Sequence, residues 1–246
     1  MEQLYTIPVN EAFEASAADP ACGCPLCALY LKLQENELDL ILGASMMEPD
    51  TRKRTNAEGF CRRHFGMMFG RKNRLGLALM MESHLAEIRP ALDDEGFLSL
   101  IQGPGTGTVK KLGKLDESCY VCSRIEMHFS RMLETVLLLW RNEKEFKKKL
   151  DAQPLFCLPH YRRMLELAKQ TLGKKEYPEF LRAAGDVVRR YADTLSEDVS
   201  WFCRKFDYRY QDEPWKNSKD AVERTVRFLS GCDGSTPAAI GWEKAK

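Results

Sequence analysis

Four short motifs in the chain have the residue types and spacing of metal ligands. Two are CxxC pairs and two are CxxH pairs, and their members are Cys24, Cys27, Cys61, His64, Cys119, Cys122, Cys157 and His160. Three thiolates and one imidazole are a common tetrahedral set for zinc, and a two-residue gap lets both members of a motif reach one ion. The sequence therefore predicts two Cys₃His sites, with two Zn²⁺ per chain as the expected cofactors.

The motifs occur twice in the same order, CxxC before CxxH. The gap from the second to the third cysteine is 34 positions in the first copy (27 to 61) and 35 in the second (122 to 157). An aromatic residue precedes each CxxH and another follows it, at Phe60, Phe65, Phe156 and Tyr161. This repetition predicts an internal duplication in which each copy binds one ion and joins the ends of two antiparallel helices.

Other chemistries remain open for these cysteines. Thiolate-rich sites also suit iron–sulfur clusters, and Cys22 is a possible alternative ligand that would replace His64 as a fourth sulfur. The second copy has Glu117 at the position of Cys22, so it lacks this option. A thioredoxin-like pair would need a βαβ context that the sequence does not provide. Cys203 and Cys232 are expected to be ordinary cysteines without a metal role.

Helix starts are the expected location of the motifs. Pro25 suits the first turn of a helix that begins just after Cys24, and Gly59 allows a similar start around Cys61. The unpaired N–H groups and the positive dipole end of a helix N-terminus stabilise thiolates.

The apolar residues repeat at helical spacing along nearly the whole chain, and no period-2 segment of strand length occurs. The stripe after Cys122 predicts one helix from about 120 to 150, and a last helix is expected from Ser218, as its N-cap, to Gly231. The fold class is therefore all-α: duplicated, metal-clasped helical hairpins plus a C-terminal helical segment. The expected boundaries are a first unit at 1–102, a glycine- and lysine-rich linker at 103–115, a second unit at 116–175, C-terminal helices at 176–232 and a flexible tail at 233–246.

The segment 201–224 combines aromatic and charged residues densely. A polar surface site there would use Lys205, Asp207, Arg209 and Trp215. A chain reversal in which Trp215 packs against the core explains the same composition and is favoured. His84 and His128 lie within expected helices and are not expected to be ligands.

The composition limits the classes of function. The chain has 37 basic and 36 acidic side chains and a formal charge of +1, so no overall field favours nucleic acid or anionic lipid. The N-terminal residues do not have the pattern of a secretory signal, and the longest apolar run, 136–140, is too short to span a bilayer. The nine cysteines fit a reducing compartment. We therefore expect a cytoplasmic protein. No common catalytic motif occurs, which favours a non-catalytic protein that binds a protein or small-molecule partner, as a monomer or a dimer.

Longer motifs carry a resemblance that extends from end to end. They are TIPVNEAFE at 6–14, CPLC at 24–27, TNAEGFCRRH at 55–64, NRLGLALM at 73–80, FCLPHY at 156–161, and KFDYR with DEPW at 205–215. The chain resembles an uncharacterised bacterial family, a domain of unknown function that is frequent in anaerobic Firmicutes. The resemblance implies a cytoplasmic, largely helical, metal-binding protein of unassigned activity. An iron–sulfur redox or metallocentre-handling protein of anaerobic metabolism is the alternative.

Overall fold

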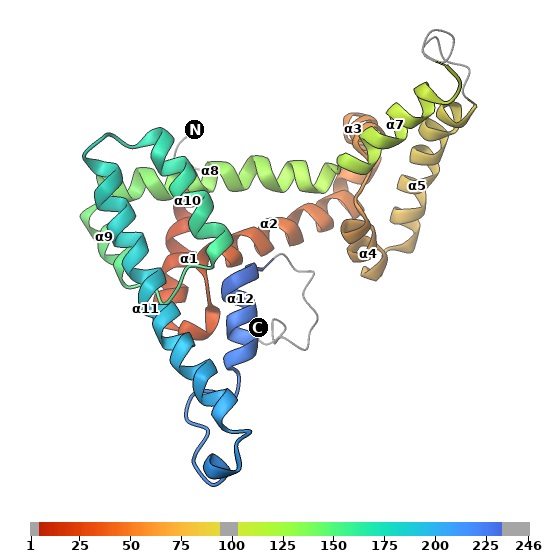
Figure 1. Ribbon diagram of the computed structural model, residues 1–246. Coiled ribbons are helices and arrows are strands. Elements are labelled where there is room, and N and C mark those ends of the chain that lie inside the picture. Colours follow the sequence, from red (N-terminus) through yellow and green to blue (C-terminus); the bar gives the residue numbers. More distant parts are fainter. Residues whose placement is uncertain (1–4, 94–102, 233–246) are drawn as a thin grey trace. The chain divides into compact units, whose positions relative to one another are not determined.

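A computed structural model describes residues 5–93 and 103–232, and in these ranges the chain is helical without any strand (Figure 1). The all-α prediction is confirmed. The expected flexible tail, 233–246, lies outside the described residues. The α-helices are α1 (Thr6–Ala18), α2 (Pro25–Leu42), α3 (Pro49–Glu58), α4 (Arg62–Gly70), α5 (Arg74–Ile88), α7 (Thr106–Glu117), α8 (Tyr120–Asn142), α9 (Lys144–Asp151), α10 (Leu158–Thr171), α11 (Glu176–Arg204) and α12 (Ala221–Ser230). Short 3₁₀ helices are η2 (Pro20–Cys22), η3 (Ala44–Met47), η4 (Arg89–Leu92) and η5 (Tyr208–Tyr210).

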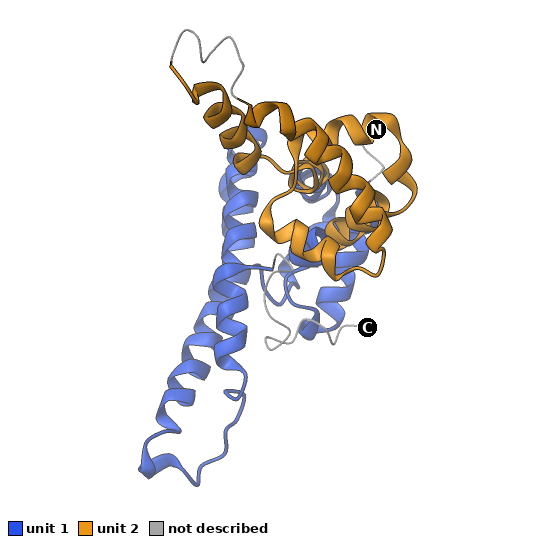
Figure 2. Cartoon of the chain, turned by 90° about the vertical axis from the view of Figure 1, so that its right-hand side faces the viewer, with its two compact units in different colours: residues 1–31, 129–246 blue, residues 32–128 orange. Residues whose placement is uncertain are grey.

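The chain forms two compact units (Figure 2). Unit 1 comprises residues 1–31 and 129–246, and unit 2 comprises residues 32–128. The chain passes from one unit to the other within α2 and within α8. Each unit therefore contains part of both helices, an arrangement that the sequential boundaries expected from the cysteine spacing do not include.

The apolar stripe expected after Cys122 is buried at all seven positions: Ile125, Phe129, Met132, Leu133, Val136, Leu137 and Trp140. The expected helix is nevertheless interrupted, because α8 ends at Asn142 and α9 begins at Lys144. A straight continuation would place Glu143, Lys144 and Lys147 on the buried face. The extended backbone of Glu143 (φ −119°, ψ 114°) redirects the chain and lets Phe146 enter the core.

Aromatic side chains fill the core of unit 1. The ring of Phe13, from α1, lies 5.0 Å from the ring of Phe146 and 6.0 Å from that of Phe156, between centroids. Trp140 meets Phe180 edge to face at 5.1 Å. These contacts join α1 to α9 and to the segment before α10, and they join α8 to α11.

Most of the segment 103–115, expected to be a linker or exposed loop, is helical, and none of the residues of this helix is buried. Gly105, with a left-handed backbone (φ 80°), precedes α7, which begins at Thr106. The lysines that suggest a loop are also good helix formers, and three of them occupy this helix together with two leucines. The Thr108 hydroxyl donates to the carbonyl of Ala91 at 2.7 Å and holds α7 against η4.

The last helix differs from the expectation at its start only. Its N-cap is Asp220, and Ser218 instead closes the preceding turn, where its hydroxyl donates to the carbonyl of Trp215 at 2.7 Å. Gly231 ends the helix with φ 70°, as expected for a C-terminal glycine. In the described ranges no helix is long and apolar enough to cross a bilayer.

Candidate metal centres

All four motifs begin helices. Cys24, Cys61, Cys119 and Cys157 directly precede α2, α4, α8 and α10, and the carbonyl of each accepts an N–H of the first turn at 2.9–3.3 Å. The second member of each motif follows three residues later, in that first turn. Pro25 is the first residue of α2, which confirms the expected helix start. Each candidate ion would thus lie at the positive ends of two helices.

Site 1 consists of Cys24, Cys27, Cys157 and His160, all buried and all in unit 1. The Nδ1 atom of His160 lies 3.2 Å from Sγ of Cys157, 3.4 Å from Sγ of Cys27 and 4.0 Å from Sγ of Cys24. The sulfur atoms of Cys27 and Cys157 are 3.6 Å apart.

Site 2 consists of Cys61, His64, Cys119 and Cys122, all in unit 2. The Nδ1 atom of His64 lies 3.3 Å from the sulfur of each of the three cysteines. The sulfur atoms of Cys61 and Cys122 are 3.9 Å apart.

The structure brings together all eight predicted ligands but pairs them differently from the expectation. Each CxxC joins the CxxH of the other copy. The reason is helix length: α2 has 18 residues and α8 has 23, which separates the start of each from its end by about 27 Å and about 35 Å at 1.5 Å per residue. The next helices, α3 with 10 residues and α9 with 8, span only about 15 Å and about 12 Å and cannot return a CxxH to its own CxxC.

Both sets have the dimensions of one tetrahedral ion. Zinc bonds of about 2.3 Å to sulfur and about 2.0 Å to nitrogen place the sulfurs about 3.8 Å apart and sulfur and nitrogen about 3.5 Å apart. The separations at both sites, 3.6 and 3.9 Å between sulfurs and 3.2–4.0 Å from sulfur to nitrogen, match these values. In each set all four ligand atoms lie within 4.8 Å of one another. Each set could therefore hold one metal ion.

The thiol pKa values show why these sets favour a cation. In site 2 the hydrogen bond from Cys122 lowers the pKa of Cys119 to about 3, and the same bond raises the pKa of Cys122. In site 1 burial opposes ionisation of Cys24, yet hydrogen bonds from Cys157, Cys27 and His160 lower its pKa. The pKa of Cys27 is raised, first by its hydrogen bond with Cys157. Protein groups alone thus lower the pKa of one thiol in each set, and a divalent cation would stabilise the thiolate form of all three.

Aromatic rings and a cavity adjoin site 1. The ring of His160 lies 5.0 Å from the ring of Phe129 and 6.1 Å from that of Tyr30. A cavity of about 320 Å³ is lined by Cys24, Cys27 and Cys157. Its wall also includes η2, Tyr191, Asp220, Arg224 and Arg227.

Cys22 lines this same cavity. It therefore lies beside site 1, whereas His64 belongs to site 2. The prediction that Cys22 could replace His64 is wrong, because the two residues serve different sets. The crossed pairing of the motifs is the cause.

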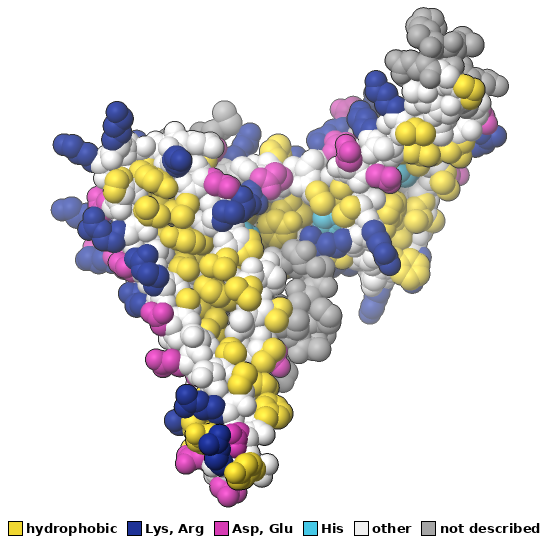
Figure 3. Space-filling view, viewed as in Figure 1, with side chains coloured by type: hydrophobic (Ala, Val, Ile, Leu, Met, Phe, Trp, Pro, Cys, Tyr) yellow, Lys and Arg dark blue, Asp and Glu magenta, His cyan; other side chains and the backbone are white. Residues whose placement is uncertain are grey.

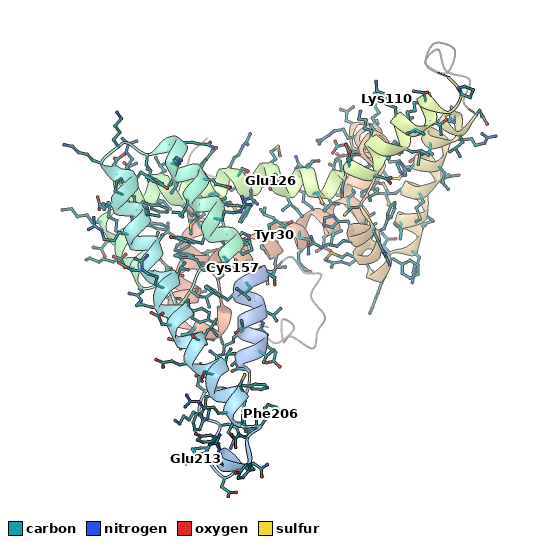
Figure 4. The ribbon with its side chains drawn as sticks, viewed as in Figure 1. Tyr30, Lys110, Glu126, Cys157, Phe206 and Glu213 are labelled. Atoms are coloured by element: carbon teal, nitrogen blue, oxygen red, sulfur yellow. The ribbon has the colours of Figure 1, made fainter. Side chains whose placement is uncertain are left out.

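Cys232 is the residue that sequence reasoning missed. Its side chain is 4% exposed, and its hydrogen bond is the second contribution, after that of Cys157, to the raised pKa of Cys27. Figure 4 labels Cys157 where α10 begins, beside the end of α12. A Cβ atom at Gly231 would lie only 3.3 Å from Sγ of Cys157, so Gly231, which follows α12, lies directly against site 1. Cys232 belongs to no spaced motif, and nothing in the sequence signals this contact.

Hydrogen bonds between two loops hold site 2. The N–H of Tyr120 donates to the carbonyl of Gly59 at 3.0 Å, and the hydroxyl of Ser118 donates to the carbonyl of Glu58 at 2.6 Å. These bonds fix the start of α8 beside the start of α4. Cys61 and Cys122 remain partly exposed.

The two remaining histidines have structural contacts. Nδ1 of His84 lies 3.1 Å from the carbonyl oxygen of Asn56, and the ring of His84 packs against Gly59. Nε2 of His128 lies 3.7 Å from a carboxylate oxygen of Glu37, which also pairs with Arg124. Neither histidine belongs to a metal set among the described residues.

The segment 201–224 separates into a buried anchor and an exposed tip. The Lys205 ammonium, 6% exposed as a residue, donates to the carbonyls of Tyr210 at 2.6 Å, Gln211 at 2.7 Å and Glu213. It therefore closes the chain reversal after α11. The Trp215 ring lies 5.8 Å from that of Phe202, between centroids, as packing would require.

At the tip, Asp207 and Arg209 form an exposed pair with 2.6 Å between Oδ2 and Nη2. Phe206 is 74% exposed and Tyr208 is 80% exposed. Figure 3 shows hydrophobic, basic and acidic side chains together at this end of α11, where Figure 4 labels Phe206 and Glu213. The four residues of the predicted polar site thus divide into Lys205 and Trp215, which stabilise the reversal, and Asp207 and Arg209, which face outward.

Comparison with protein families gives one assignment. The model of a family of unknown function matches residues 1–235. No curated protein and no solved structure matches the chain.

Proposed function

We propose that this chain, which belongs to the family of unknown function DUF6062, is a zinc-stabilised helical protein that acts by binding a partner. The observation that carries the proposal is the spacing of the ligand atoms, which lie within 4.8 Å of one another in both sets. An iron–sulfur cluster contains several iron atoms bridged by sulfide, which would hold the protein ligands farther apart than a single ion does. The spacing therefore favours one zinc ion per site.

Each zinc ion would have a structural role. Three cysteines and one histidine already supply four ligands, which is the closed coordination of structural zinc and gives no position for a reacting water. Three thiolates and Zn²⁺ carry a net charge of −1, which the N-termini of two helices would stabilise. The ion would hold together the starts of two helices that lie far apart in the sequence.

The partner of this scaffold is a protein or a small molecule in our proposal. The exposed rings of Phe206 and Tyr208 beside the Asp207–Arg209 pair support protein binding at the tip of α11. Aromatic and arginine side chains are enriched where proteins bind one another. Zinc thiolates need reduced cysteines, which supports a cytoplasmic location.

A second candidate is a redox or metallocentre-handling protein. The cavity beside site 1 favours it, because it is lined by three ligand cysteines and by Cys22. In that case the ion would be exchanged or would change its oxidation state, and site 1 would be the active centre.

Elemental analysis and a visible spectrum of protein purified without oxygen test both candidates. We expect two zinc ions per chain, no visible absorbance, and one ion in each of the variants Cys61→Ser and Cys157→Ser. The matched control is Cys203→Ser, which changes an exposed cysteine outside both sets and should keep two ions. Iron with acid-labile sulfide would contradict the zinc proposal and favour the second candidate.

A further inference from the structure

We propose that α5 is a self-association surface: two copies of the chain bind each other through an exposed face of this helix, with the two α5 helices antiparallel. The surface lies in unit 2 and includes no ligand of either metal set and no residue of the tip of α11. The inference therefore goes beyond the proposed function and does not rest on it.

An apolar stripe runs along α5 and into η4 outside the core of unit 2. Its members follow one another at steps of three, four, three and four residues: Ala78, Met81, Leu85, Ile88 and Leu92. Leu85 is 65% exposed and Leu92 is 54% exposed, whereas the buried residues of α5 lie on a neighbouring face. Such steps are the pattern of a helix that packs along its length against another helix.

The described part of unit 2 leaves this stripe uncovered. The buried face of α5 packs against α3, and α7 packs on η4. None of the residues of α7 is buried, so this helix does not enclose the stripe either. Figure 3 shows hydrophobic side chains over α5, which Figure 1 labels. A further helix therefore fits this face.

The side chains of the stripe favour a second copy of α5 as that helix. In an antiparallel pair centred at the level of Ser83, Ala78 of one copy lies opposite Ile88 of the other. In the same register, Met81 of each copy lies opposite Leu85 of the other. Small and large side chains thus alternate across the seam, which lets the two helices interdigitate.

Two charged residues beside the stripe give the pairing its direction. Glu82 and Arg89 lie seven residues apart and flank the stripe on one side. An antiparallel copy reverses their order, so the same register brings Glu82 of each copy to Arg89 of the other. In the described ranges Glu82 has no ion-pair partner, and Arg89 pairs with Asp93 on the exposed surface of its own chain. Both side chains are therefore available to pair across the interface.

The size of the stripe sets the expected strength of the dimer. From Ala78 to Leu92 the helix is about 22 Å long and about 10 Å wide, a footprint of about 220 Å² on each copy. A standard interface buries about 800 Å² on each partner. We therefore expect a weak dimer, with a dissociation constant in the micromolar range or above.

Sedimentation velocity of the full-length protein, from low to high micromolar concentrations, tests the inference. We expect a reversible equilibrium between monomer and dimer. Leu85→Glu should weaken association about tenfold or more, because it buries a charge without a partner at the centre of the seam. The urea midpoint of this variant as a monomer should stay unchanged. The matched control is Leu229→Glu, since Leu229 is 55% exposed on α12 in unit 1 and its replacement should leave the dimer unchanged.

Charge exchange tests the antiparallel direction. Glu82→Arg and Arg89→Glu should each weaken association several-fold, because each variant places like charges opposite one another. The double variant should recover it, because both pairs then form with their charges exchanged.

Four results would overturn the inference. One is a monomer at every concentration. Another is a dimer that Leu85→Glu leaves intact or that Leu229→Glu weakens equally, which would place the interface elsewhere. A third is a double charge variant that associates as weakly as the single variants. The last is a lower urea midpoint of monomeric Leu85→Glu, which would mean that another part of the same chain covers the stripe.

Discussion

Sites 1 and 2 have the same ligand types at the same helix positions, yet they lie in different environments. Site 1 is fully buried in unit 1, beside aromatic rings and two further thiols, Cys22 and Cys232. Site 2 is partly exposed, its CxxH contains two arginines, and hydrogen bonds between loops hold it. The comparison teaches that the residues around a ligand set, and not the set alone, decide how exposed a bound ion would be and which side chains would lie beside it.

The two units also differ in their cores. Among the residues that the structure describes, the aromatic side chains that are almost fully buried all lie in unit 1: Phe13, Phe129, Trp140, Phe146, Phe156 and Phe180. The largest side chains buried to the same degree in unit 2 are aliphatic or Met, such as Leu38 and Met80. Aromatic side chains bury the most apolar area, so hydrophobic burial should stabilise unit 1 more than unit 2. Unit 2 should depend more on its ion.

Removal of metal should give the largest effect and tests this difference directly. With a strong chelator, we expect amide hydrogens of α4 and α5 in unit 2 to lose protection from exchange before those of α10 and α11 in unit 1. Structural zinc contributes about 10–16 kcal/mol of binding free energy in small zinc peptides, so its loss exceeds the stability of a typical domain. Hydrogen exchange followed by mass spectrometry measures the order.

The matched variants are Cys61→Ser for site 2 and Cys157→Ser for site 1. The first should unfold unit 2, and the second should loosen the start of α10 while the aromatic core keeps the rest of unit 1 folded. Earlier loss of protection in unit 1 than in unit 2 would contradict this order.

Two glycines next to the sites provide a smaller test. Gly59 has φ 62° beside site 2, and Gly231 has φ 70° beside site 1. An alanine at either position would adopt a backbone that costs about 1–3 kcal/mol. Its Cβ would lie 3.2 Å from the ring of His84 at Gly59 and 3.3 Å from Sγ of Cys157 at Gly231. We expect Gly59→Ala to lower the free energy of unfolding, and Gly231→Ala also to weaken zinc binding at site 1 alone.

Urea unfolding and competition with a zinc chelator measure the two quantities. Gly66→Ala is the control, because it lies within α4 and its Cβ would meet nothing within 4 Å. A helical Gly→Ala change there should be neutral or stabilise by about 0.5–1 kcal/mol. Equal effects of Gly231→Ala on both sites would reject the local contact between the end of α12 and site 1.

The ligands were predictable from the sequence, but their pairing was not. CxxC and CxxH spacing, with Pro25 after Cys24, is a local signal, and it identified the eight residues and their positions at helix starts. The pairing depends on where long helices end, and the similar spacings of 34 and 35 residues suggested the wrong partners. The turn at Gly231, where a Cβ atom would lie 3.3 Å from Sγ of Cys157, brings the end of α12 to site 1, and no short pattern encodes this contact between distant parts of the sequence.

A pair of serines gives the smallest expected effect and compares the loops of the two sites. Ser16 donates to the carbonyl of Gly23, just before the CxxC of site 1, and Ser118 donates to the carbonyl of Glu58, near the CxxH of site 2, both at 2.6 Å. Ser16 is 1% exposed, whereas Ser118 is only partly buried. In Ser16→Ala water cannot easily replace the lost donor, so we expect a cost of about 1–3 kcal/mol, against about 0.5–1.5 kcal/mol for Ser118→Ala. Urea unfolding of the two variants measures the difference. A larger cost for Ser118→Ala would mean that the loop bonds of site 2 contribute more to stability than the more deeply buried bond beside site 1.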